Sequence, residues 1–176
     1  MTTATDLYAL NLAEATSLVR HSGDTTVLVQ GHMGTGKSSM LKILAQELPD
    51  HIPCYFDCTT KDLGDITIPN VMNLNGIVSE SGEINEEAFV RYVTNEELGV
   101  HLNKPIILMI DEYGKANPAV KNALLRLMLE KQIGSRKLRG IIFATTNLGS
   151  EGVGDLLPAH ARNRLTVVKM RKPTNV

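Results

Sequence analysis

One glycine-rich octapeptide combines the residue types that bind phosphate: Gly-His-Met-Gly-Thr-Gly-Lys-Ser at positions 31–38. Its spacing fits G-x-x-x-x-G-K-[ST], in which glycines let the backbone wrap phosphate groups with its N–H groups facing the anion. Lys37 would neutralise the β- and γ-phosphates of a nucleotide, and Ser38 would coordinate Mg²⁺. The motif therefore predicts ATP and Mg²⁺ as cofactors. The predicted nucleotide-binding residues are Gly31, Gly34, Thr35, Gly36, Lys37, Ser38 and Ser39. The alternative is a glycine-rich turn that matches by chance.

An acidic pair, Asp111-Glu112, directly follows the apolar run Ile106–Ile110. A carboxylate at the carboxyl end of a parallel strand points into the crevice where open α/β sheets bind ligands. Asp111 fits the role of organising Mg²⁺, and Glu112 fits the base that orients and polarises the attacking water. The alternative is an acidic turn that opens the next element. The phosphate-binding motif upstream favours the catalytic interpretation.

An asparagine and two arginines complete the candidate site. Asn147 ends the run Phe-Ala-Thr-Thr-Asn, where its amide could hold the attacking water or contact the γ-phosphate. Asparagine also ends strands for local reasons, so this assignment depends on the other motifs. Arg162 and Arg164 lie in the segment LPAHARNRL, and arginine is suited to stabilising charge on a transferring phosphoryl group. The alternative for at least one of the two is a basic surface turn.

The elements that would position these residues alternate between strands and helices. Strands are predicted at Thr25–Gln30, Pro53–Cys58, Ile106–Ile110, Gly140–Thr146 and Leu165–Met170. Helices are predicted from Thr5 to about His21, over Lys37–Leu48 and Glu83–Leu98, and from Pro118, capped by Asn117, to Ile133 before Gly134. The irregular segment Lys61–Gly82 is predicted as a long loop or hairpin. Apolar strands alternating with helices indicate an α/β fold with a parallel sheet covered on both sides.

Composition and charge exclude several other classes of protein. A hydrophobic content of 43% with 21% charged residues is typical of a globular domain, and 176 residues suit one such domain. A net charge of −1 argues against a protein that coats nucleic acid, but not against nucleic acid gripped within an assembly. Cys54 and Cys58 would lie roughly 13 Å apart in a strand, too far for a disulfide, which favours reduced thiols. No apolar run reaches membrane-spanning length and Met1–Asp6 is no signal peptide, so we expect a cytoplasmic protein with no membrane partner.

Taken together, GHMGTGKS, IILMIDE, FATTN and LPAHARNRL resemble the AAA+ ATPases, specifically their MoxR-like and dynein-related branch. The resemblance is closest from Asp111 to Leu165, extends weakly to Thr60-Lys-Asp-Leu-Gly64, and covers about Leu7 to Lys172. It implies a P-loop NTPase three-layer sandwich whose five-stranded parallel sheet has the order 5-1-4-3-2. It also implies a homo-oligomeric ring, usually a hexamer, with ATP sites shared between neighbours. Arg164 matches the arginine finger that acts in trans, and Arg162 is the second choice.

Family members remodel protein partners, often with von Willebrand A-type proteins, and some relatives act on nucleic acid. They also carry a helical lid after the arginine segment, whereas this chain ends twelve residues after Arg164. Residues 1–176 are therefore expected to be the AAA+ core without its lid, either because it was cut there or because a separate chain completes the site. The predicted function is ATP hydrolysis that remodels a macromolecular partner. One alternative is a non-catalytic, ATP-dependent loader, which the missing lid leaves open. The other is a small P-loop kinase, and Glu112 and Asn147 favour hydrolysis over that interpretation.

Overall fold

The computed structural model describes residues 8–73, 88–134, 136–147, 157, 161 and 163–173, with the backbone alone for residues 71–73 and 88–91. Its centre is a five-stranded sheet in the order β2-β5-β8-β1-β9, in which every neighbouring pair is parallel. The strands are β1 (Val27–Gly31), β2 (Ile52–Asp57), β5 (Ile106–Asp111), β8 (Gly140–Asn147) and β9 (Thr166–Met170). Numbered among themselves in chain order and read from β9, these strands have the order 5-1-4-3-2. The predicted topology is confirmed.

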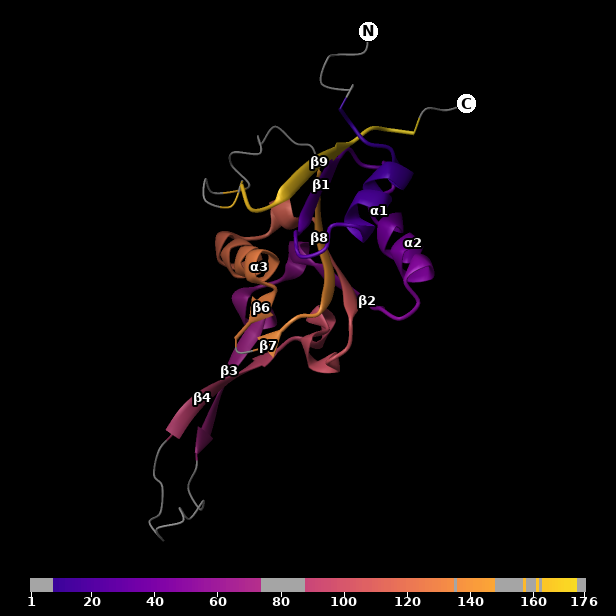
Figure 1. Ribbon diagram of the computed structural model, residues 1–176. Helices are drawn as coiled ribbons and strands as arrows, with labels where there is room; N and C mark the ends of the chain where they lie inside the picture. Colours follow the sequence, from indigo (N-terminus) through magenta and orange to yellow (C-terminus); the bar gives the residue numbers. More distant parts are fainter. Residues whose placement is uncertain are drawn as a thin grey trace.

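Helices cover both faces of this sheet (Figure 1). α1 (Leu12–Arg20) and α2 (Ser39–Glu47) pack on one face, and α3 (Pro118–Glu130) packs on the other. All five residues of β1 are buried, as expected for a parallel strand covered on both sides. In the described part of the chain, no helix is long and apolar enough to cross a membrane. The predicted three-layer α/β sandwich is confirmed.

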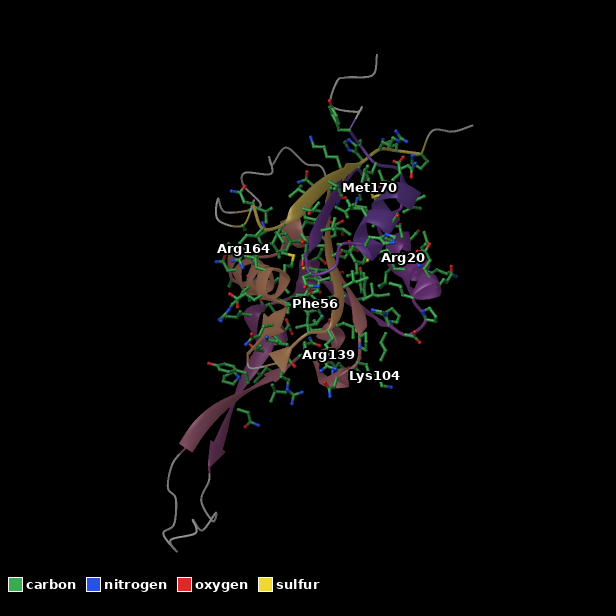
Figure 2. All side chains as sticks on the ribbon, viewed as in Figure 1. Arg20, Phe56, Lys104, Arg139, Arg164 and Met170 are labelled. Atoms are coloured by element: carbon green, nitrogen blue, oxygen red, sulfur yellow. The ribbon has the colours of Figure 1, made fainter. Side chains whose placement is uncertain are left out.

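Two apolar clusters fill the space between the layers. The cluster between the sheet and α3 includes Leu28, Phe56, Leu108, Val120 and Leu124, and Figure 2 shows Phe56 near the centre of the molecule. The cluster between the sheet and the other two helices includes Val19, Val29, Met40, Leu44, Ile107 and Met109. Complete burial of a side chain of this size stabilises the fold by about 1.5–3 kcal/mol. Packing on both faces therefore holds the strand ends in fixed positions.

The first helix begins later than predicted. The predicted N-cap, Thr5, lies outside the described residues, and α1 begins only at Leu12. Asn11 caps it: Asn11 Oδ1 accepts from the Glu14 amide at 2.9 Å, and the Asn11 amide donates to Glu14 Oε2 at 2.8 Å. Leu10 pairs with β9 through an isolated parallel bridge. The prediction of a helix through Leu10 is therefore wrong, because this residue is recruited to the sheet.

The third helix begins where the sequence predicts. The side chain of Asn117 accepts from the Val120 amide at 2.9 Å, and Pro118 occupies the first turn. Proline suits this position because its missing N–H would have no partner within the helix.

The end of α3 differs from the prediction, which placed it at Ile133 before Gly134. The helix stops before Lys131, whose φ of 48° is left-handed. The next residues form β6 (Gln132–Ile133), which pairs with β7 (Arg136–Lys137). The Lys131 ammonium donates to two backbone carbonyl oxygens outside the helix at 2.8 and 2.9 Å. These contacts stabilise the left-handed backbone of Lys131, at which the helix ends earlier than predicted.

A two-stranded antiparallel ribbon projects from the body of the molecule (Figure 1). It consists of β3 (Thr67–Asn73) and β4 (Ala88–Thr94). The predicted loop or hairpin at Lys61–Gly82 is a hairpin strand over Thr67–Asn73, and residues 74–82 lie outside the described part. The predicted helix at Glu83–Leu98 is wrong over residues 88–98, which contain β4 and a short 3₁₀ turn at Glu96–Leu98, while residues 83–87 lie outside the described part. The β4 sequence AFVRYVT is rich in valine, threonine and aromatic residues, which favour strands.

Cys54 and Cys58 are both free and buried, in agreement with the prediction of reduced thiols. Burial, with a smaller contribution from neighbouring carboxylates, raises the pKa of the Cys58 thiol to about 12. Since the thiolate is the reactive form, this thiol is a packing group.

Candidate active site

Three strand ends carry the residues that the sequence singles out. β1 ends at Gly31, β5 at Asp111 and β8 at Asn147. The register pairs Gly31 with Asn147, and parallel strands bring their carboxyl ends to the same edge of the sheet. The loop that ends at Ser38 leads from this edge into α2. The structure therefore brings the glycine-rich loop, the acidic pair and Asn147 together.

The glycine-rich loop adopts backbone conformations that side chains oppose. The φ angles are 79° at Gly34 and 91° at Gly36. A Cβ on Gly31 would lie 2.7 Å from Thr35 Oγ1, so the loop folds tightly over its own start. Thr35 is buried, and its hydroxyl donates to the His32 carbonyl oxygen at 3.0 Å. The loop is thus shaped by its glycines and braced from within by Thr35.

Lys37 is buried at the inner side of the loop, with 8% of its surface exposed. Its ammonium donates to the carbonyl oxygens of Gly31 and His32 at 2.7 and 2.9 Å, and to Asn147 Oδ1 at 3.0 Å. Burial lowers the pKa of Lys37, while the carboxylates of Glu112 and Asp111 act in the opposite direction. The ammonium therefore has a partner for each of its three N–H groups, and all three partners are uncharged.

Glu112 follows β5 in a left-handed conformation, with φ 54° and ψ 37°. Its carboxylate accepts from Asn147 Nδ2 at 2.7 Å on Oε1 and 3.0 Å on Oε2. Lys115 forms an ion pair with Oε2 at 3.3 Å. Glutamate rarely adopts such a φ, and strained residues cluster at functional sites. The turn and the Asn147 amide together aim this carboxylate back across the sheet edge.

Asp111 is held by donors from three directions. Tyr55 Oη donates to Oδ2 at 3.0 Å, while Thr145 Oγ1 and the Glu112 amide, the latter at 3.1 Å, donate to Oδ1. Asp111 is buried and Tyr55 is half exposed. Burial raises the pKa of the Tyr55 hydroxyl, and so does its hydrogen bond to Asp111. The hydroxyl is therefore a stable donor, and the carboxylate has one fixed orientation.

The oxygen atoms at the carboxyl edge of the sheet are suitable ligands for Mg²⁺. Ser38 and Ser39 are exposed at the start of α2, and the Ser38 hydroxyl makes no capping bond to the helix. Mg²⁺ prefers oxygen ligands and is usually held by one or two protein groups together with substrate phosphates and water. The Ser38 hydroxyl and the Asp111 carboxylate supply this chemistry.

Sequence reasoning missed three side chains of this network: Tyr55, Lys115 and Thr145. Tyr55 lies on β2, where only the strand register reveals its neighbour on β5. Thr145 lies two residues before Asn147 in the same strand, and this two-residue spacing was the one signal in the sequence that could have identified it. Lys115 lies three residues after Glu112 in a 3₁₀ turn, a spacing at which side chains meet in a helix.

The two predicted arginines have different outcomes. Arg162 lies outside the described residues. Arg164 is exposed on the α3 side of the sheet (Figure 2), and its amide donates to the Ala161 carbonyl oxygen at 3.0 Å. Its side chain stands outside the contacts described above for Lys37, Glu112 and Asn147. The structure therefore does not bring Arg164 into the site of its own chain.

The model of one protein family, described as "ATPase family associated with various cellular activities (AAA)", matches residues 27–171. This range runs from the start of β1 to just beyond β9 and contains every candidate site residue. No curated protein is a significant match to the sequence.

Solved structures show the same fold. NtrX from Brucella abortus in complex with ADP has a TM-score of 0.56 and 14% identity over 94% of this chain and 37% of that one. The Thermotoga maritima RuvB Holliday junction branch migration motor has a TM-score of 0.51 and 20% identity over 90% of this chain and 44% of that one. The chain therefore spans about two fifths of the length of these structures, and likeness at such identity is a likeness of fold.

Proposed function

The chain belongs to the AAA family of ATPases, and on this basis we propose that it binds ATP with Mg²⁺ and hydrolyses ATP where β1, β5 and β8 end. The observation that carries the proposal is the side-chain contact network of Asn147. One amide links the buried ammonium of Lys37 to the carboxylate of Glu112. A cation for phosphate and a base for water thus lie on either side of one polar group.

Lys37 is the proposed phosphate contact. Its three acceptors are uncharged oxygens of Gly31, His32 and Asn147. A phosphate oxygen is an anionic acceptor, and hydrogen bonds between charged partners are roughly twice as strong as neutral ones. Exchange of one uncharged acceptor for a phosphate oxygen therefore favours nucleotide binding. The remaining carbonyl contacts keep the ammonium in place.

Glu112 is the proposed base, and Asn147 orients it. A base must be held within hydrogen-bonding reach of the attacking water, whose proton it accepts. The two Asn147 contacts fix the plane of the Glu112 carboxylate, and the left-handed turn directs it toward the loop edge. Bound Mg²⁺ would neutralise phosphate charge, with Ser38 and Asp111 holding it and its waters.

We further propose that ATP sites are completed between subunits of a ring. Arg164 is exposed and outside the contacts of its own site, as a residue that reaches a neighbour would be. Arginine is the residue suited to charge on a transferring phosphoryl group. The motifs resemble those of the MoxR-like branch, and we propose that residues 27–171 form its nucleotide-binding core in a cytoplasmic assembly. Its client would be a protein, a von Willebrand A-type partner or nucleic acid.

The proposal is tested by measuring nucleotide binding and phosphate release together for wild-type protein, Glu112→Gln and Glu130→Gln. Glutamine fills the same space without a charge, so Glu112→Gln should bind ATP with Mg²⁺ as wild type does. Its phosphate release should fall roughly 10²–10⁴-fold, the usual contribution of a general base. Glu130, an exposed residue paired with Arg126, provides the matched control and should behave as wild type.

Normal turnover by Glu112→Gln would remove Glu112 from the role of base. Transfer of phosphate to a small acceptor, with no free phosphate, would favour a kinase over an ATPase. Binding without either product, even at high protein concentration, would favour the non-catalytic loader.

A further inference from the structure

Tyr55 makes a contact at the candidate site for which the proposed function has no use. Its hydroxyl donates to Asp111 Oδ2 at 3.0 Å, although Tyr55 belongs to neither the glycine-rich loop nor the acidic pair. It lies on β2, an edge strand of the sheet. The contact therefore joins the outermost strand to the carboxylate that is proposed to hold Mg²⁺.

The parallel register places this hydroxyl. Tyr55 is paired with Met109, and Asp57 is paired with Asp111. Side chains two residues apart in a strand point to the same face, so Tyr55 lies diagonally opposite Asp111. Phe56 packs in the cluster under α3, so Tyr55 points to the face that carries α2. This is also the side on which Met109 packs against the α2 cluster.

The hydrogen bonds of Asp111 leave it little freedom. Oδ1 accepts from Thr145 and from the Glu112 amide, and Oδ2 accepts from Tyr55. A carboxylate has about four acceptor positions, so three are used and the open one is on Oδ2. Tyr55 therefore donates to Oδ2, the same carboxylate oxygen that remains open to a ligand of Asp111. Without Tyr55, the Oδ2 side of the carboxylate would have no donor.

We propose that Tyr55 is a positioning residue for Mg²⁺, which it serves by fixing the orientation in which Asp111 presents its open acceptor position to the cation or its waters. The inference rests on the proposed function, since it assigns a role toward the same Mg²⁺. It adds a residue from β2 to a site otherwise built by β1, β5 and β8. Tyr55 acts through Asp111 and does not itself touch the reacting atoms.

The test compares nucleotide affinity with Mg²⁺ and with EDTA, by calorimetry of a non-hydrolysable ATP analogue, so that turnover plays no part. Tyr55→Phe should bind the analogue normally in EDTA and lose about tenfold of the affinity that Mg²⁺ adds. Mn²⁺ binding to the protein–analogue complex, followed by electron paramagnetic resonance, should weaken by a similar factor. A tenfold change corresponds to about 1.4 kcal/mol, close to the lower limit for a hydrogen bond to a charged group.

Two other tyrosines supply matched controls. Tyr92 is exposed on the β3–β4 ribbon, so Tyr92→Phe should leave both affinities unchanged. Tyr113 is buried and its hydroxyl donates to the Lys121 carbonyl oxygen at 3.1 Å. Tyr113→Phe should lower thermal stability without changing the Mg²⁺ dependence. Tyr92→Phe therefore controls for the loss of a tyrosine hydroxyl as such, and Tyr113→Phe controls for a loss of stability. Neither variant removes the contact with Asp111.

A double-mutant cycle distinguishes action through Asp111 from any other route. In an Asp111→Asn background, Tyr55→Phe should have no further effect on Mg²⁺ dependence. Wild-type Mg²⁺ dependence in Tyr55→Phe, or an equal loss of affinity in EDTA, would overturn the inference and leave the proposed function standing. Wild-type protein whose nucleotide affinity is indifferent to Mg²⁺ would overturn both.

Discussion

The side-chain amide of Asn147 donates to both carboxylate oxygens of Glu112, at 2.7 Å to Oε1 and 3.0 Å to Oε2. The carbonyl oxygen of the same amide accepts from Lys37 at 3.0 Å. Because an ammonium only donates and a carboxylate only accepts, these two partners fix which way the amide points. Asn147 therefore connects the two charged groups of the site, and replacing it disturbs both.

Asn147→Ala should reduce ATP hydrolysis roughly 10²-fold, the effect typical of removing one positioned donor from an active site. Affinity for ATP should change less than tenfold, because Lys37 keeps its two backbone carbonyl partners. Steady-state kinetics and calorimetry measure the two effects separately. Asn122→Ala, an exposed substitution on α3, is the matched control. Unchanged hydrolysis in Asn147→Ala would mean that Glu112 needs no orienting amide.

Lys37→Ala should weaken ATP binding at least tenfold, about 1.4 kcal/mol, because the β- and γ-phosphates lose their main cation. Calorimetry with ATP and Mg²⁺ provides the measurement. Lys42→Ala removes an exposed lysine of α2 and should bind ATP normally. Wild-type affinity of Lys37→Ala for ATP would show that the glycine-rich loop does not bind the phosphates through Lys37.

Arg164→Ala should abolish hydrolysis with little loss of ATP binding, because arginine fingers supplied in trans contribute roughly 10³–10⁵-fold in rate. Wild-type activity should rise steeply with protein concentration. Mixing Arg164→Ala with Glu112→Gln should partly restore turnover, since some interfaces then pair an intact Glu112 with an intact Arg164.

Arg171→Ala is the control for that experiment, because Arg171 is exposed and its nearest acidic partner is Glu14 at 3.7 Å. Because the finger would act between subunits, complementation is measured in an assembled ring. In such a ring, wild-type activity of Arg164→Ala would move the finger assignment to Arg162.

Asn117→Ala should lower the free energy of unfolding by about 1 kcal/mol, because α3 loses the cap of its Val120 amide. The Asn117 side chain also donates to the Lys61 carbonyl oxygen and to Asp62 Oδ1, at 3.3 and 3.2 Å. Asn117→Ser keeps a capping oxygen and should lose less than half as much. Urea denaturation measures both variants. Equal losses would indicate that the cap contributes nothing and the long-range contacts everything.

The sheet and its functional edge could be predicted from the sequence because their signals are local. Each parallel strand is a short apolar run, and the Gly31–Ser38 and Asp111-Glu112 motifs stand directly at strand ends. Once the strands are parallel, their carboxyl ends must meet at one edge. Asn147 therefore joins the site by topology alone.

The predictions from sequence were wrong where contacts with distant parts of the chain determine the local structure. Leu10 is extended because it pairs with β9, at the other end of the sequence. β4 is a strand because β3 supplies its partner, and strand formation depends on such context more than helix formation does. Tyr55 escaped notice for the same reason: its acceptor, Asp111, lies 56 residues away along the chain.

The left-handed backbone of Glu112 sets a limit on engineering this protein. A residue with a Cβ loses about 1–2 kcal/mol in this conformation, which glycine adopts freely and asparagine tolerates. A screen that selects only for heat resistance would therefore enrich glycine or asparagine at position 112. Such variants would fold better and would lack the carboxylate that we propose as the base. Position 112 should be held constant in any library built for thermostability, and the gains sought elsewhere in the chain.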